Sequence, residues 1–219
     1  MTMFSEDNKP DLKSNLVYSI ERHRHQKRIL GFLQNSLPGL ARQLIEAVDF
    51  TLSNMCEDDI SREIVNLLND KIRESSGYIF RFEAKSGPDI LIYALPYAPF
   101  SSELLVIEAK RLPPTSSRDY VHTGIGRFKR EEHGKQHDIA AILGYVQDED
   151  FAHWYKKINS WIDDLIHKAN ESPAWIEQDK LCRVKEGDLG EYESIHSRVS
   201  KDPIALRHFW IMLNKTKAN

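Results

Sequence analysis

The stretch from residue 78 to residue 112, YIFRFEAKSGPDILIYALPYAPFSSELLVIEAKRL, contains the pattern that decides the fold. It opens with aromatic residues in alternation, which is typical of a strand, and continues with two nearly all-apolar runs at 90–92 and 104–107. Such runs indicate strands that are buried on both faces. Asp89 begins the second predicted strand and Glu108-Ala109-Lys110 ends the third. We therefore expect two carboxylates and one lysine at neighbouring strand ends of a single sheet.

Helical periodicity flanks this stretch on both sides. Before it, the apolar spacing predicts three helices, with a break at Asn35–Gly39 between the first two: 12–34, 40–55 and 58–74. After it, the predicted elements are a short helix near 122–136, a buried strand at 138–147, an amphipathic helix from about 148 to 169, and closing strands at 181–184, 192–199 and 204–213. The last of these segments is also compatible with a helix. No repeat or low-complexity linker divides the chain, so we expect one α/β domain.

The composition narrows the class of protein. The chain has 219 residues, of which 41% are hydrophobic and 29% charged, as in ordinary globular proteins. No apolar run approaches the ~20 residues of a membrane span, and the polar N-terminus is not typical of a signal peptide. The two cysteines, Cys56 and Cys182, lack the spacing of a metal site or a disulfide framework. We read them as free thiols and expect a cytoplasmic protein.

The net charge of −3 is not that of a protein that coats nucleic acid, so any such contact must come from local patches. One candidate patch is the segment 108–136, which holds seven basic and four acidic residues. Other chemistries lack a signal: there is no phosphate-binding glycine loop, no zinc-type spacing and no evident serine or cysteine nucleophile with a matching base.

The acidic residues of the central stretch suit a divalent cation. Asp89 and Glu108 offer hard oxygen ligands of the kind that Mg²⁺ or Mn²⁺ prefers, and the Ala109 carbonyl is a further possible ligand. Lys110 lies two positions after Glu108, so both side chains face the same side of a strand. An ammonium group there can orient a water molecule and stabilise negative charge. The alternative without a function is a polar strand end with surface charges. Buried apolar strands run directly into these residues, which favours a site over this alternative.

Gly87-Pro88-Asp89 followed by Glu108-Ala109-Lys110, after a helix that carries Glu63, resembles the PD-(D/E)xK or restriction-endonuclease-like nuclease superfamily. The resemblance covers the middle of the chain. It implies an αβββαβ core with a mixed central sheet flanked by helices, here with N-terminal helical and C-terminal strand additions. The implied division is 1–56 as a helical extension, 57–147 as the catalytic core and 148–219 as a C-terminal helix and strands.

The resemblance also implies roles for individual residues. Asp89 and Glu108 would bind Mg²⁺ or Mn²⁺, Lys110 would be the catalytic lysine, and Glu63 would be the helix carboxylate, with Glu57 as the alternative. A second tripeptide, Glu83-Ala84-Lys85, precedes the aspartate instead of following it. We interpret its charged residues as a solvated or site-edge pair rather than a catalytic pair.

By the same resemblance, the expected activity is metal-dependent hydrolysis of phosphodiester bonds, most naturally in DNA, in bacterial restriction or anti-phage defence. A partner protein of a defence complex, or a homodimer, would then supply specificity. Candidate contacts with the nucleic-acid backbone are Arg127, Lys129, Arg130 and Gln136, although a solvated helix face explains them equally well. His196 and His208 are weaker candidates for the site. The competing hypothesis is a catalytically silent subunit that keeps the nuclease fold and binds nucleic acid or a partner protein.

Overall fold

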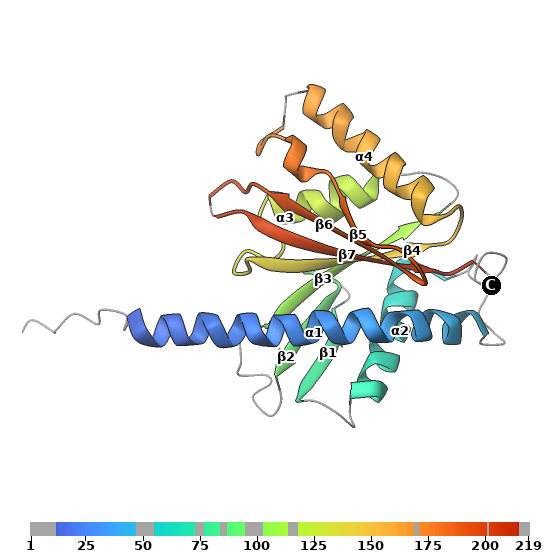
Figure 1. Ribbon diagram of the computed structural model, residues 1–219, viewed down its shortest axis with the longest axis horizontal. Helices are drawn as coiled ribbons and strands as arrows, with labels where there is room; N and C mark the ends of the chain where they lie inside the picture. The colour runs from blue at the N-terminus through green and yellow to red at the C-terminus, as the bar shows by residue number, and fades with distance from the viewer. Residues whose placement is uncertain are drawn as a thin grey trace, which may run out of the picture.

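The protein is described by a computed structural model, which covers residues 12–46, 55–72, 77–83, 87–94, 103–113, 118–168, 171–200 and 202–214. A seven-stranded mixed sheet has helices on both of its faces, which confirms the predicted α/β class (Figure 1). Within these residues, no helix combines the length and the apolar character needed to cross a membrane.

The sheet has the strand order β1-β2-β3-β4-β7-β6-β5. Its strands are β1 (Tyr78–Phe82), β2 (Ile90–Ala94), β3 (Leu105–Leu112), β4 (Ile139–Val146), β5 (Cys182–Lys185), β6 (Leu189–His196) and β7 (Ile204–Met212). The three central strands β3, β4 and β7 are parallel, and the outer pairings are antiparallel. This arrangement explains the continuous apolar run of β4, because a central parallel strand is covered on both faces.

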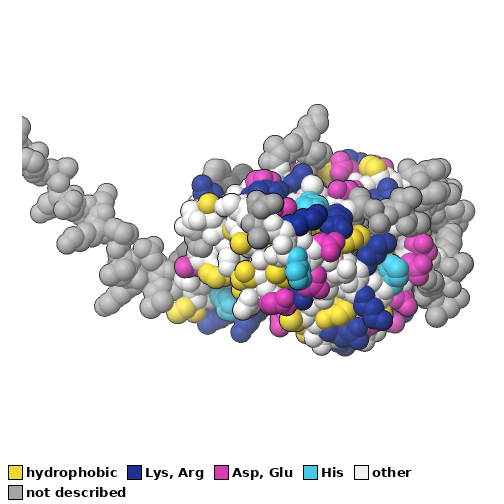
Figure 2. Space-filling view, turned by 90° about the horizontal axis from the view of Figure 1, so that it is seen from above, with side chains coloured by type: hydrophobic (Ala, Val, Ile, Leu, Met, Phe, Trp, Pro, Cys, Tyr) yellow, Lys and Arg dark blue, Asp and Glu magenta, His cyan; other side chains and the backbone are white. Residues whose placement is uncertain are grey.

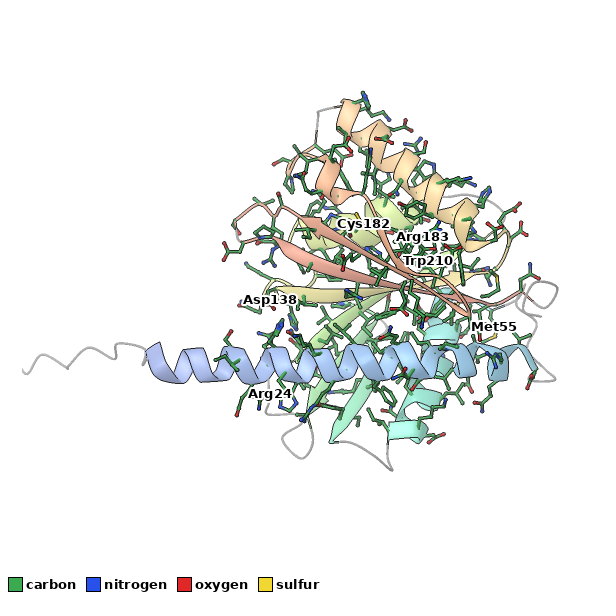
Figure 3. All side chains as sticks on the ribbon, in the orientation of Figure 1. Arg24, Met55, Asp138, Cys182, Arg183 and Trp210 are labelled. Atoms are coloured by element: carbon green, nitrogen blue, oxygen red, sulfur yellow. The ribbon has the colours of Figure 1, made fainter. Side chains whose placement is uncertain are left out.

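The helices divide between the two faces and create two hydrophobic cores. α1 (Leu12–Glu46) and α2 (Glu57–Ile72) cover one face, and the stripe Ile60, Ile64 and Leu68 of α2 is buried there. The π-helix η1 (Tyr120–Ile125), the short α3 (Gly126–Lys129) and α4 (Phe151–Lys168) cover the other face. Trp210 of β7 lies in this second core between the sheet and α4 (Figure 3). A 3-10 turn, η2 (Glu177–Asp179), precedes β5.

The predicted break between the first two helices is wrong. α1 continues through the segment 35–39 as one helix of 35 residues with Pro38 inside it, so a single helix spans most of the predicted pair (Figure 1). A proline inside a helix removes one backbone hydrogen bond and costs about 3 kcal/mol. Here Leu37, Leu40 and Leu44 are fully buried against the sheet and extend the apolar stripe past the proline. Packing of this face therefore outweighs the local cost.

The helix predicted near 122–136 is shorter than expected. η1 and α3 run only from Tyr120 to Lys129, and a turn follows in which Glu131 and Gly134 both have φ near +60°. The left-handed backbone at these two positions ends the helix and reverses the chain. The closing segment, which was also compatible with a helix, is the strand β7. Ala84 and Lys85 of the second Glu-Ala-Lys tripeptide lie outside the described residues.

Candidate active site

The pairing of β2 with β3 brings Asp89 to the backbone of the Glu108-Ala109-Lys110 segment. Ile90 pairs with Ile107 in this antiparallel register, so the residue before Ile90 meets the residue after Ile107. The Asp89 Oδ2 atom accepts a hydrogen bond of 2.6 Å from the backbone N–H of Ala109. The two motifs, separated by nearly twenty residues in sequence, thus form one cluster at the junction of the two strands.

Lys110 is the centre of this cluster. Its side chain is only 7% exposed and projects from the same face of β3 as Glu108. Its Nζ atom lies close to three oxygens: Glu57 Oε1 at 2.8 Å, Glu108 Oε1 at 2.9 Å and the Ala109 carbonyl at 2.6 Å. A buried ammonium with three oxygen partners is fixed in position and keeps its charge.

α2 contributes Glu57, not Glu63, to the cluster. Glu57 stands in the first turn of α2, and its Oε2 atom accepts a 2.8 Å hydrogen bond from the backbone N–H of Arg111 while Oε1 pairs with Lys110. Glu63 is exposed. Because it precedes the buried Ile64 by one position, the helix turns it away from the sheet. Glu63, the helix carboxylate expected first, is therefore not at the site, and the alternative Glu57 takes its place.

Glu108 is completely buried and surrounded by basic groups. Besides Lys110, the Arg127 Nη1 atom lies 2.8 Å from its Oε1 atom. The His133 Nδ1 atom lies 2.8 Å from Oε2, but the ring is not oriented for a hydrogen bond, so both atoms are buried without a well-directed partner. The turn after α3 holds His133 in this position, because the backbone N–H groups of Glu132 and His133 both donate to the Arg127 carbonyl. Sequence reasoning missed His133, because nothing local marks this long-range contact.

These contacts perturb the acidity of the central groups. Burial, and then the neighbouring charge of Glu108, raise the pKa of Asp89 to about 6. Burial would also raise the pKa of Glu108, but His133 and Lys110 outweigh it and the pKa is lowered. Burial would lower the pKa of Lys110, whereas the carboxylates of Glu108 and Glu57 raise it. At neutral pH the cluster therefore contains ionised Glu108 facing a charged lysine.

The donor set of the cluster fits a small hard cation. Among the described residues, no group of three or more Asp, Glu, His or Cys side chains is arranged as a ready set of ligands. Mg²⁺, however, keeps several waters and needs only one or two protein carboxylates. Asp89 and Glu108 could supply these, and Glu108 Oε2 is a buried oxygen without a directed hydrogen bond. The Ala109 carbonyl already accepts a hydrogen bond from Lys110 Nζ.

A cleft lies beside this region on the α3 face of the sheet, although Asp89, Glu108 and Lys110 do not themselves line it. It has a volume of about 360 Å³, and its lining includes Pro88 and Leu91 from the β2 side, Val106 of β3, and His133 and Gly134 from the turn after α3. Pro88 adjoins Asp89 in sequence, and His133 contacts Glu108. A substrate group in the cleft would therefore lie next to the cluster, with Pro88 and His133 between the cleft and the two carboxylates.

The four residues predicted to contact a nucleic-acid backbone have different surroundings. Lys129 was placed there wrongly: its side chain is 2% exposed and pairs with Asp179 at 2.8 Å, so it faces the second core. Arg130 is exposed and pairs with Glu132. Gln136 is exposed, and its carbonyl accepts a hydrogen bond from Arg22. Arg127 is the one member of the four that points to the cluster.

His196 and His208 lie away from the carboxylate cluster, inside the second core. They belong to a buried chain of polar side chains that we name the C-terminal polar network: Lys129, Asp179, His196, Ser194, His208, Tyr120 and Trp210. The successive contacts are 2.6–2.8 Å long. The network ties α3 and η1 to η2, β6 and β7.

Part of this network has the connectivity of a serine-hydrolase triad. Asp179 Oδ1 lies 2.6 Å from His196 Nδ1, and His196 Nε2 lies 2.6 Å from Ser194 Oγ. All three side chains are buried, and Ser194 Oγ is also within 2.7 Å of His208 Nε2. A nucleophile needs access to its substrate and donors for the developing oxyanion, whereas this serine is buried and its hydroxyl is held between two histidines. The network is structural.

Comparison with known proteins adds no relative: no protein-family model, no curated protein and no solved structure matches this chain. The functional conclusion rests on the geometry of the cluster and on the resemblance of its motifs.

Proposed function

We propose that this protein is a metal-dependent nuclease with a restriction-endonuclease-like core that hydrolyses phosphodiester bonds, with DNA as the substrate suggested by the resemblance. The observation that supports this proposal best is that Asp89, just before β2, lies against the segment of β3 that carries Glu108 and Lys110, beside a cleft. The order α2, β1, β2, β3, α3, β4 supports the proposed core. Restriction or anti-phage defence, with a partner protein or a second copy for specificity, extends the same proposal.

Each residue of the cluster has a role in this proposal. Asp89 and Glu108 would hold Mg²⁺ or Mn²⁺, which when bound polarises a phosphoryl oxygen and makes its water more acidic. Lys110, held by Glu57, presents a fixed positive charge to the attacking water and to the charge that develops on the phosphate. Burial of these groups strengthens their electrostatic interactions with the substrate.

The experiment is a cleavage assay on duplex and single-stranded DNA, with and without Mg²⁺ or Mn²⁺. We expect metal-dependent cutting by the wild type and a loss of about 100-fold or more for Asp89→Ala and Lys110→Ala, since each removes a charged group at the reacting centre. Arg118→Ala is the matched control, because Arg118 pairs with Asp164 on the surface. If the wild type does not cut, with either metal and with any co-purifying protein, the proposal is wrong.

One observation favours the silent-subunit alternative. Glu108 is enclosed by Lys110, Arg127 and His133, so its carboxylate is neutralised by side chains of the protein itself. A protein that keeps the fold only for binding would have this property. Metal binding by the wild type, measured by calorimetry with Mn²⁺, separates the two functions even where the DNA substrate is not yet optimal.

A further inference from the structure

We propose that Arg127 is a positioning residue with two partners: Glu108 when no metal is bound, and a phosphate of the substrate when a divalent cation occupies the carboxylates. This inference rests on the proposed nuclease function and deepens it. It assigns Arg127 a competition with the cation for one carboxylate oxygen, a role distinct from the general backbone contact expected from its position in the sequence.

The contacts of Glu108 provide the first step. Its Oε1 atom is shared by two cations, Lys110 Nζ at 2.9 Å and Arg127 Nη1 at 2.8 Å. Lys110 has two further oxygen partners, Glu57 Oε1 and the Ala109 carbonyl. Among the described residues, Arg127 forms an ion pair only with Glu108, and Glu132 attracts it at longer range. A cation that binds Glu108 through the open Oε2 and also takes Oε1 therefore displaces Arg127 more easily than it displaces Lys110.

Exposure gives the second step. The side chain of Arg127 is 36% exposed, against 7% for Lys110 and 8% for His133. Arg127 approaches Glu108 from the solvent side, so its guanidinium can rotate out while its backbone stays in α3. The backbone is itself fixed, because the Arg127 carbonyl accepts hydrogen bonds from Glu132 and His133 at 2.9 and 3.3 Å. In this proposal the Arg127 side chain moves while the turn after α3, which lines the cleft, stays in place.

Charge balance gives the third step. Without a metal, the carboxylates of Glu57, Asp89 and Glu108 face the permanent positive charges of Lys110 and Arg127. A divalent cation adds two positive charges, so the four positive charges of this set exceed the three negative ones, and the nearby guanidinium is repelled. A phosphodiester restores the balance. A planar guanidinium also binds phosphate oxygens in a bidentate manner, which makes this its natural second partner.

The test compares the wild type with Arg127→Gln. We expect the variant to bind Mn²⁺ about tenfold more tightly by calorimetry, because one charged hydrogen bond no longer competes for Glu108. We expect the same variant, loaded with Ca²⁺ to prevent cutting, to bind a fluorescent duplex DNA about tenfold more weakly. Arg130→Gln is the matched control for Mn²⁺ affinity, since Arg130 neighbours α3 and pairs with Glu132 instead of Glu108.

The outcomes separate this inference from the proposed function. Wild type that binds Mn²⁺ and cuts DNA, together with an Arg127→Gln variant whose Mn²⁺ affinity is unchanged or weaker, overturns the inference alone. Unchanged DNA affinity of the variant overturns it as well. Wild type that neither binds Mn²⁺ nor cuts DNA overturns the proposed function and this inference with it. A thermal unfolding curve of Arg127→Gln that matches the wild type shows that the variant is folded.

Discussion

Glu57 and Glu63 belong to the same helix, yet only one of them reaches the candidate site. The Glu57 carboxylate accepts the Arg111 backbone N–H and pairs with Lys110, so it joins the start of α2 to the end of β3. An acidic residue in the first turn of a helix is also favoured by the positive helix terminus. Glu57 therefore positions the lysine, which is a different task from binding metal.

We predict that Glu57→Gln lowers the rate of DNA cleavage by about 10- to 100-fold, because a displacement of the lysine by a fraction of an ångström misaligns the reacting groups. Glu63→Gln, on the exposed face of the same helix, should leave the rate within twofold of the wild type. Steady-state cleavage rates of the two variants provide the comparison. Equal losses in both variants, or a loss only in Glu63→Gln, would contradict the assignment.

At the scale of elements, the packing of β4 against β7 places Gly144 beside Trp210. The two residues are paired in the parallel register, and Trp210 is fully buried. A Cβ atom at Gly144 would lie 2.4 Å from Trp210 Cδ1 and 2.9 Å from its Nε1. The indole is held in place, because its Nε1 donates to the Tyr120 hydroxyl and its ring centroid lies 4.2 Å from that of Tyr192. The glycine is thus required by the close approach of a large side chain.

Gly144→Ala should lower the free energy of unfolding by about 2–3 kcal/mol, as overpacking of a filled core does. The control is Gly187→Ala, because a Cβ there meets nothing within 4 Å. Urea unfolding followed by tryptophan fluorescence measures both variants. A Gly144→Ala protein as stable as the wild type would show that the core around Trp210 is looser than this packing implies.

Over the whole molecule, charge is distributed rather than concentrated. Figure 2 shows basic and acidic side chains interspersed on the face seen from above, without one continuous basic surface. The net charge of −3 agrees with this distribution. Affinity for nucleic acid would then come from the site itself and from a bound cation. The more unusual feature of the charge distribution is internal, since several ionisable groups are buried in the second core and near the cleft.

Three buried histidines make the stability of the fold dependent on pH. Burial lowers the pKa of His196 and His208, and burial with the nearby Arg22 lowers that of His137 to about 4. Below pH ~6.5 the unfolded chain binds protons that the folded chain does not, so stability falls as pH falls toward 4. Each histidine contributes at most about 1.4 kcal/mol per pH unit, and only above its pKa in the folded protein, while Asp89, whose pKa is raised to about 6, opposes one of them.

We therefore expect the free energy of unfolding to be nearly constant between pH 8 and 7 and to decrease by up to about 3 kcal/mol per pH unit between pH 6 and 4. Urea titrations at four pH values across this range measure it. His153→Gln is a suitable control, because His153 is exposed on α4 and its removal should not alter the slope. A flat profile down to pH 4.5 would contradict the buried, neutral state of these histidines.

The sequence by itself determined the strands of the sheet and three members of the cluster. Apolar runs and alternation are local signals, so β1 to β4 and the place of Asp89 at the start of β2 followed from them. The prediction that Glu108 and Lys110 stand at the end of their strand is wrong, because β3 continues to Leu112 along its partner β4. The same local signals predicted a helix break at Pro38 and a surface lysine at 129, and both were wrong. In each case burial of the segment against a distant part of the chain outweighed its local preference.

Only the tertiary structure decided which helix carboxylate reaches Lys110 and which basic groups surround Glu108. Glu57 acts across 53 residues of sequence, Arg127 reaches Glu108 from α3, and His133 reaches it from the turn after α3, where the backbone is left-handed at Glu131 and Gly134. Such contacts have no periodicity to reveal them, because they follow from how whole elements pack. Hydrogen-bond and ion-pair partners of a buried charge are chosen by that packing, so they appear only when the sheet and its two helical layers are assembled.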